Sequence, residues 1–366
     1  MAGVCCYYLL FSHNIPHLSH IYPTPNLMNE PIEVLMTLPF PEELVDSLRK
    51  ISPRLKIHVQ RARKPEEIAP EIWARSEVLY TASLLPSPEQ SPNLRWIQFH
   101  YAGADHAITH AILSRPGVVA TTLSGAASSQ MAEYILMMLL ALGHRLPDLI
   151  TAQRKPEWPK DRWERFNPLE LRGSTVGIIG YGSIGRQVAR LLQPLGALVL
   201  ATKRNAMQPA DYDYSPEGMG DPSGDLVHRL YPAEALRSML RECDFVVVTV
   251  PKTPATTDLI AAEELAAFKP DAFLIDVSRG GIVNHPALIS ALKEHKIAGA
   301  ALDVFPEEPL PPDSPLWKLP NVLLTPHISG NTPHYDQRAT DTFAANLQRY
   351  IAGLPLYNRI DPARGY

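Results

Sequence analysis

Three side chains that could bind and protonate a carbonyl compound each follow an apolar run in the second half of the chain. Arg279 comes shortly after FLIDV, Glu308 after ALDVF, and His327 after VLLT. Short runs that are apolar on both sides are typical of strands covered on both faces of a parallel sheet. Because parallel strands end at one edge, where ligands bind, we expect an arginine, a carboxylate and a histidine to meet there.

These residue types suit hydride transfer to a 2-keto acid, whose carbonyl oxygen gains a proton as the hydride reaches carbon. His327 can give that proton near neutral pH. A carboxylate on the other ring nitrogen would orient the imidazole and favour its protonated form, and Glu308 is the candidate. Arg279 can bind the substrate carboxylate and polarise the carbonyl. Taken singly, each residue also fits a structural role, as a loop histidine, a surface glutamate or an ion-pair partner.

A glycine-rich segment precedes these residues. Gly180, Gly182 and Gly185 form the pattern G-x-G-x-x-G between an apolar run and a helical stretch, which is the context of a dinucleotide fingerprint. The first glycine would allow a tight turn, the second the approach of the pyrophosphate, and the third close packing of helix on strand. The helix N-terminus would then attract phosphate. The alternative is a plain corner between a strand and a helix.

The segment VLATKRN, Val199 to Asn205, lacks the acidic residue that usually holds the adenosine ribose at this distance from the fingerprint. Thr202, Lys203 and Arg204 stand there instead. An arginine at this point can accommodate a 2′-phosphate. The segment therefore predicts a preference for NADP(H), with NAD(H) still possible. The alternative is a solvated loop with two surface cations.

The elements that would position these residues form two alternating blocks. Apolar runs alternate with helical patterns over 28–122 and again over 174–325. This predicts an α/β fold with two doubly wound parallel-sheet domains, Rossmann-like or flavodoxin-like, and a cleft between them. A stretch over 128–146 is apolar nearly all round, which indicates a helix buried in a core or a subunit interface. A last helix is expected over 335–351, completing the first unit.

Two segments depart from this alternation. Residues 1–27 are rich in His and Pro after a short apolar start, so we interpret them as a disordered extension or an upstream start ahead of Met28. The alternative is a weak signal peptide, although a positively charged start is missing. Residues 205–231 form an acidic insertion rich in Pro and Gly, which predicts a surface loop of unassigned role.

The composition limits the classes of partner. With a net charge of −4, the chain has no basic excess that would favour nucleic acid. Cys5, Cys6 and Cys243 show no spacing for zinc or a disulfide framework, so we expect no metal and a reducing, cytoplasmic location. No apolar run has the length of a membrane span.

Several segments together resemble the D-isomer-specific 2-hydroxyacid dehydrogenases. The matching stretches are LRGSTVGIIGYGSIGRQVA, CDFVVVTVPKTPATTDLI, DVSRGGIVNHPALISALKEHKIAGAALDVFPEEPL and NVLLTPHISGNT, with looser similarity in LRWIQFHYAGADH and SSQMAEYILMMLLALGHRLP. The resemblance implies a discontinuous substrate-binding domain, 28–127 plus 330–366. It also implies a dinucleotide-binding Rossmann domain, 128–329, inserted into the first domain, and a homodimer formed partly by the long helix.

Carried over residue by residue, the resemblance makes Arg279, Glu308 and His327 the catalytic set, with Glu308 rather than Glu307 as the carboxylate. Asp303 would contact the carboxamide of the cofactor. Backbone amides of the loop Tyr101, Ala102 and Gly103 would hold the substrate carboxylate. The other residues expected to line the cofactor site, besides His327 and the fingerprint glycines, are Ser183, Ile184, Val250, Pro251, Val277, Ser278 and Gly330.

The sequence thus predicts an NADP(H)-preferring reductase of a small 2-keto acid, such as glyoxylate, hydroxypyruvate or a bulkier analogue. Formate is disfavoured, because the resembling formate dehydrogenases carry glutamine where Glu308 stands. The alternative class is a dinucleotide-sensing binding protein, like the corepressors that share this fold, and the intact catalytic set argues against it. Residues near Leu84 and Tyr101 are expected to shape the substrate pocket, but their spacing does not select one keto acid.

Overall fold

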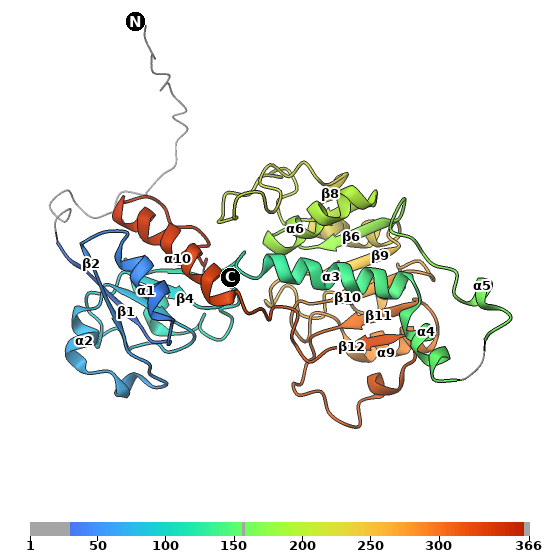
Figure 1. Cartoon of the computed structure of the whole chain (residues 1–366), viewed down its shortest axis with the longest axis horizontal. Coiled ribbons are helices and arrows are strands. Elements are labelled where there is room, and N and C mark those ends of the chain that lie inside the picture. The colour runs from blue at the N-terminus through green and yellow to red at the C-terminus, as the bar shows by residue number, and fades with distance from the viewer. Residues whose placement is uncertain (1–29, 156–157, 362–366) are drawn as a thin grey trace, which may run out of the picture.

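The computed structural model describes residues 30–155 and 158–361. The extension predicted for residues 1–27 therefore lies outside the described residues. The described chain forms two lobes, each built on one sheet (Figure 1). The α/β fold class with two parallel-sheet units is confirmed.

The first sheet has the strand order β2-β1-β3-β4-β5, and its strands pair in parallel. Its strands are β1 (Ile32–Met36), β2 (Leu55–Val59), β3 (Val78–Thr81), β4 (Trp96–Phe99) and β5 (Val119–Thr121). The helices in this part of the chain are α1 (Glu42–Arg49) and α2 (Pro70–Arg75). A short 3-10 helix, Pro65–Glu67, precedes α2 and is separate from it, because Pro70 disfavours helical geometry at Ala69 (φ −59°, ψ 139°).

The second sheet has the order β12-β11-β10-β9-β6-β7-β8, again parallel throughout. Its strands are β6 (Thr175–Ile179), β7 (Leu198–Thr202), β8 (Arg229–Tyr231), β9 (Phe245–Val248), β10 (Phe273–Asp276), β11 (Gly299–Leu302) and β12 (Val322–Leu324). The helices of this part are α3 (Ser128–Gly143), α4 (Leu146–Gln153), α5 (Arg162–Arg165), α6 (Ser183–Leu192), α7 (Leu236–Leu240), α8 (Ala262–Leu265) and α9 (His285–Lys293).

Both faces of the second sheet are covered by apolar side chains. Successive residues of a strand point to opposite faces, so Val246 packs in one core cluster with Leu288 of α9, and Val247 packs in the other with Ile135 of α3. The four residues of β9 are all buried. This explains why the strands are apolar without alternation, as the sequence suggested.

The last helix, α10 (Tyr335–Ile351), returns to the first sheet (Figure 1). Its buried residues Phe343 and Leu347 belong to the core cluster that contains Val34 of β1 and Trp96 of β4. The expectation that this helix completes the first unit is confirmed. The first sheet therefore depends on a segment more than 200 residues away in the sequence.

The long apolar helix is only partly buried. In α3, Ile135 and Leu139 are buried, but Met137 and Leu140 are 51% and 40% exposed. The exposed apolar side chains continue along α4, where Leu149 is 40% exposed. The sequence predicts burial of this stretch in a core or in a subunit interface. One face of α3 packs in a core of the chain, and burial of its exposed face in a subunit interface remains a prediction.

The insertion over 205–231 is not a surface loop throughout. Its last three residues form the edge strand β8, which pairs in parallel with β7. Asp221 is 4% exposed and accepts hydrogen bonds from Tyr181 Oη and from the backbone N–H groups of three following residues. Composition predicted a solvated segment, but a buried carboxylate with four donors makes this part of the insertion a packed element.

Among residues 30–155 and 158–361, no single helix is long and apolar enough to cross a membrane; the bent pair α3 and α4 meets only length and composition criteria. Within the same ranges, no group of three or more His, Cys, Asp or Glu side chains is placed to hold a metal ion.

We predict that Phe343→Ala lowers the free energy of unfolding by about 3–5 kcal/mol, because it removes a buried ring between Tyr80 and Trp96. Urea denaturation followed by circular dichroism measures the effect. Gln348→Ala, at an exposed position of the same helix, is the control and should change stability by less than about 0.5 kcal/mol. Equal effects of the two changes would contradict the packing of α10 on the first sheet.

Candidate active site

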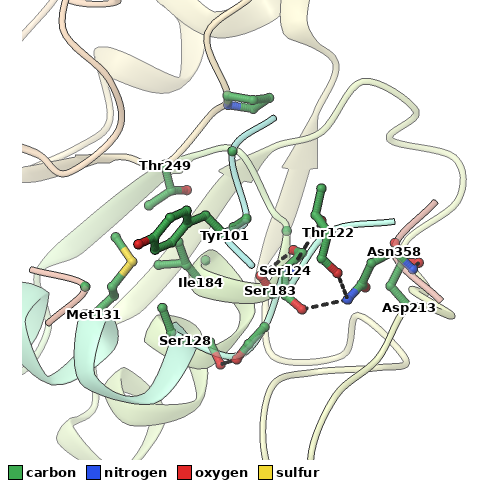
Figure 2. A pocket seen from close by; sticks show the side chains of 18 of the residues that line it. Tyr101, Thr122, Ser124, Ser128, Met131, Ser183, Ile184, Asp213, Thr249 and Asn358 are labelled. Carbon is green, nitrogen blue, oxygen red and sulfur yellow. Dashed lines mark hydrogen bonds between the residues drawn. The ribbon is translucent and has the colours of Figure 1, made fainter. Parts of the chain in front are cut away.

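A cleft of about 840 Å³ lies between the two sheets. Both units contribute, the first through the loops after β4 and β5 and the second through the loops after β6, β9, β10 and β12. Figure 2 shows Tyr101 and Thr122 from the first unit together with Ser183 and Thr249 from the second. Most of the predicted site residues line it: Tyr101, Ala102, Gly103, Gly182, Ser183, Ile184, Gly185, Val250, Pro251, Val277, Ser278, Arg279, His327 and Gly330.

The fingerprint glycines have the geometry that a dinucleotide requires. Gly180 has a φ of +100°, and a Cβ there would lie 2.8 Å from the Val250 side chain. A Cβ on Gly185 would lie 2.5 Å from the carbonyl oxygen of Gly180, so this glycine allows α6 to approach the strand. Beside Gly182, by contrast, there is open space at the first turn of α6. These residues fit a pyrophosphate held by the helix N-terminus.

His327 and Glu308 lie in direct contact. Glu308 Oε2 is 2.8 Å from His327 Nδ1, and Glu308 Oε1 accepts a hydrogen bond of 2.9 Å from the backbone N–H of Phe305. A backbone N–H of its own loop therefore holds the Glu308 carboxylate in place while the carboxylate orients the imidazole. The other ring nitrogen, Nε2, is left for a ligand, and the histidine side chain is 44% exposed at the cleft.

The backbone around His327 is held by Asp303, which is fully buried. Asp303 Oδ1 accepts hydrogen bonds from Thr325 Oγ1 (2.6 Å) and Ile328 N (2.9 Å), and Oδ2 accepts one from Ser329 N (2.9 Å). His327 itself has a φ of +53°, a region that non-glycine residues adopt rarely. The three hydrogen bonds offset the cost of that conformation.

Arg279 faces the loop of the other unit. Its Nη1 donates to the carbonyl oxygen of Ser278 at 2.8 Å. A Cβ on Gly103 would lie 2.5 Å from Arg279 Nη2, so only the absence of a side chain there lets the loop approach the guanidinium group so closely. Backbone amides of the loop 101–103 and an arginine therefore border one small region of the cleft.

Aromatic side chains border the part of the cleft beside the loop 101–103. The ring centroids of His100 and Tyr101 are 4.8 Å apart, and Tyr335 donates from its hydroxyl to the carbonyl oxygen of His100 at 2.8 Å. Burial lowers the pKa of His100 to about 4, so this imidazole is neutral at physiological pH. Leu84, expected at this pocket, instead packs in the core of the first unit and does not line the cleft.

The residues at the end of β7 lie outside the cleft. Thr202 is buried, and its hydroxyl accepts a hydrogen bond from Gly180 N at 3.2 Å. Lys203 Nζ donates to carbonyl oxygens of the insertion, at 2.8 Å to Ala210 and also to Gln208 and Pro209. Burial lowers the pKa of Lys203. The sequence did not foresee that this amine is bonded within the protein, and its part in cofactor choice remains a prediction.

Sequence reasoning missed the insertion as a wall of the cleft, which it lines over 211–216 and 220–222. Arg186, directly after the fingerprint, is 3% exposed and pairs with Asp211 Oδ2 at 3.1 Å. On the other side, Asp213 Oδ1 accepts from Asn358 N at 2.8 Å. Asn358 in turn donates to carbonyl oxygens of Thr122 and Ser124 (Figure 2). Arg186, Gln187 and Arg190 form a polar face of α6 that bonds to the insertion, and this group of polar residues directly after the fingerprint was the signal in the sequence.

Comparison with known proteins places the chain in a family. The family model for the NAD-binding domain of D-isomer-specific 2-hydroxyacid dehydrogenases matches residues 136–329. The chain is 34% identical to a glyoxylate reductase of Thermofilum pendens over 72% of this chain and 74% of the relative. It is 30% identical to a D-3-phosphoglycerate dehydrogenase of Archaeoglobus fulgidus over 90% of this chain, but it spans only 59% of that relative's length.

A solved structure agrees in fold over the same region. A D-isomer-specific 2-hydroxyacid dehydrogenase from Xanthobacter autotrophicus Py2, in complex with NADPH and MES, superposes with a TM-score of 0.73. The two chains are 30% identical, and the match covers 92% of this chain and all of the other. The fingerprint, the two parallel sheets and these matches together show that the chain belongs to the D-isomer-specific 2-hydroxyacid dehydrogenase family.

Proposed function

We propose that the protein is an oxidoreductase that transfers a hydride between NADP(H) and a small 2-keto acid, with the D-2-hydroxy acid as the reduced product. The observation that carries the proposal is the 2.8 Å contact between His327 and Glu308 at the cleft that Arg279, Gly182 and Gly185 also line. A dinucleotide-sensing binding protein has no need of such an oriented proton donor, which argues against that alternative.

The described side chains can divide the chemistry among them. Arg279 and the backbone N–H groups of Ala102 and Gly103 would hold the substrate carboxylate and polarise the carbonyl. A bound nicotinamide ring would supply the hydride. With Nδ1 bonded to Glu308, His327 would direct its Nε2 proton at the carbonyl oxygen and transfer it there as the alcohol forms.

The substrate and cofactor are proposed from the same site. Glyoxylate and hydroxypyruvate are the first candidates, which the relative named glyoxylate reductase supports. The preference for NADP(H) is supported by the absence of a carboxylate among Thr202, Lys203 and Arg204, and by the NADPH in the Xanthobacter structure. Asp303 would contact the carboxamide, and Gly180 to Gly185 the pyrophosphate.

We further propose the domain division into a substrate-binding unit, 28–127 plus 330–366, and a dinucleotide-binding unit, 128–329. A homodimer would form through the exposed apolar side chains of α3 and α4. A cytoplasmic location is supported by the lack of any disulfide spacing among the three cysteines.

We expect His327→Ala to lower kcat for the reduction of glyoxylate or hydroxypyruvate by about 10²–10⁴-fold, because the positioned proton donor is lost. Stopped-flow or steady-state absorbance at the reduced nicotinamide band measures the rate. Binding of NADPH should stay close to that of the wild type, since the fingerprint is unchanged. His334→Ala, at an exposed histidine nearby, is the control and should keep wild-type turnover.

A panel of 2-keto acids with NADPH and NADH tests the reaction class itself. The enzyme proposal fails if the wild-type protein oxidises neither cofactor with any member of the panel. Full activity of His327→Ala would leave hydride transfer possible but would remove the proposed role of the histidine.

For the cofactor, we expect a lower KM for NADPH than for NADH in the wild type. Arg204→Ala should raise the KM for NADPH about tenfold or more and leave that for NADH within about twofold, because a charged hydrogen bond to the 2′-phosphate is worth about 1.5–3 kcal/mol. Lys203→Met tests the second cation. The KM for NADPH should change little if the Lys203 amine stays bonded to the insertion. A wild type that prefers NADH would overturn the NADP(H) proposal.

For assembly, light scattering after size exclusion should give the mass of a dimer. Replacing Leu140 and Leu149 together by glutamate should give a monomer, because charges would replace exposed apolar surface. Replacing the exposed Leu354, which lies outside α3 and α4, by glutamate is the control and should leave the dimer intact. A wild type of monomeric mass would contradict the proposed interface.

A further inference from the structure

A buried carboxyl group that the proposed reaction does not use lies at the end of β10. Asp276 is 1% exposed. Its Oδ1 accepts two hydrogen bonds from Ser278, from the backbone N–H at 3.0 Å and from the hydroxyl at 2.5 Å. Its Oδ2 is buried and has no hydrogen-bond partner among the described residues. One half of this carboxyl group is thus anchored, and the other half has nothing to stabilise a negative charge.

Asp276 connects the two loops on which the proposed function depends. Through Ser278 it holds the segment that leads to Arg279, whose guanidinium group donates to the Ser278 carbonyl oxygen. Its own carbonyl oxygen accepts from the backbone N–H of Asp303 at 3.0 Å, and Asp303 holds the backbone of the His327 loop. A change of charge at Asp276 therefore alters the electrostatic environment of both the Arg279 segment and the His327 loop.

The surroundings of Asp276 favour its neutral form. Burial, together with the negative charge of Asp303 directly after β11, raises the pKa of Asp276 to about 7, against the opposing effect of the hydrogen bonds from Ser278. On the other neighbouring strand, β9, the paired residue is Val248, which carries no charge. The other ionisable groups near this edge include Arg279 in the same loop and Lys252 after β9, whose Nζ donates to the Gly280 carbonyl oxygen at 2.8 Å. They also include His327 beyond Asp303, and Tyr134 of α3, which contacts Thr325.

We propose that Asp276 is a positioning residue whose neutral form favours the reduced cofactor and the anionic keto acid in the cleft, and whose ionised form favours the oxidised cofactor. The inference rests on the proposed function. Its physical basis is the second negative charge that ionised Asp276 places beside Asp303, in a region shielded from water. An oxidised nicotinamide ring is positively charged and a reduced one is neutral, whereas the keto acid is negative. Binding of the oxidised cofactor then releases the Asp276 proton to water.

The first test compares wild type with Asp276→Asn, which keeps an oxygen for Ser278 but cannot ionise. Dissociation constants of NADPH and NADP⁺ are measured by fluorescence between pH 5.5 and 8.5. In the wild type we expect the ratio of the NADP⁺ to the NADPH constant to fall about three- to tenfold as pH rises through 7. In Asp276→Asn this fall should be absent. Asp271→Asn, at an exposed position two residues before the same strand, should behave as wild type.

A second measurement needs no variant. Calorimetry of NADP⁺ binding near pH 6.5, in buffers of different ionisation enthalpy, should show release of about half to one proton per site, and NADPH binding should show none. The release should persist in His327→Ala, which excludes the histidine as its source. Identical pH curves for wild type and Asp276→Asn, or no proton release in the wild type, would overturn the proposal.

The free protein separates this inference from the proposed function. The folded-state pKa of Asp276 lies above its ordinary value of 3.8, so the native state binds the extra proton between pH 4 and 7. Wild type should therefore lose stability relative to Asp276→Asn as pH rises through that window, with a constant difference above pH 7. If cofactors do not bind at all, the proposed function fails, yet this melting comparison still reports whether Asp276 holds its proton. A constant difference across the window would show that it does not.

Discussion

The buried carboxylate of Asp303 is the interaction on which the site depends. It directly follows β11, the second strand from one edge of the second sheet, is fully buried, and accepts three hydrogen bonds from the loop after β12. Those bonds keep His327 in a left-handed backbone conformation and so direct its ring toward Glu308 and the cleft. Because a buried carboxylate without donors would be costly, the loop and the carboxylate each require the other.

The opposite wall of the site depends on close approach between two units. Gly103 has no side chain, and Arg279 occupies the space that a Cβ would need. The loop 101–103 is in turn supported by α10, since Tyr335 bonds to the carbonyl oxygen of His100. The geometry of this wall is therefore the product of three segments that are far apart in the chain: the loop 101–103, the loop that carries Arg279, and α10.

The insertion gives the cleft a third wall. It is fastened to the fingerprint side through Arg186 with Asp211 and through Tyr181 with Asp221, and to the other unit through Asp213 with Asn358. The contact between Asp213 and Asn358 joins the insertion to the unit that contains the first sheet. The insertion also accepts hydrogen bonds from Lys203. The amine that the sequence predicts at a 2′-phosphate is therefore already bonded within the protein.

The sequence by itself determined the two parallel sheets, the fingerprint turn, and the residue types at the strand ends, because these follow from local periodicity and from the rule that parallel strands end together. It did not determine which side chains touch. The burial of Asp221, the bonds of Lys203, the placement of Leu84 in a core and the unpartnered oxygen of Asp276 depend on segments that meet only after folding. The charge and polarity of a sequence segment predict contact with solvent. Whether a side chain is buried depends on which other segments pack against it, and only the tertiary structure contains that information.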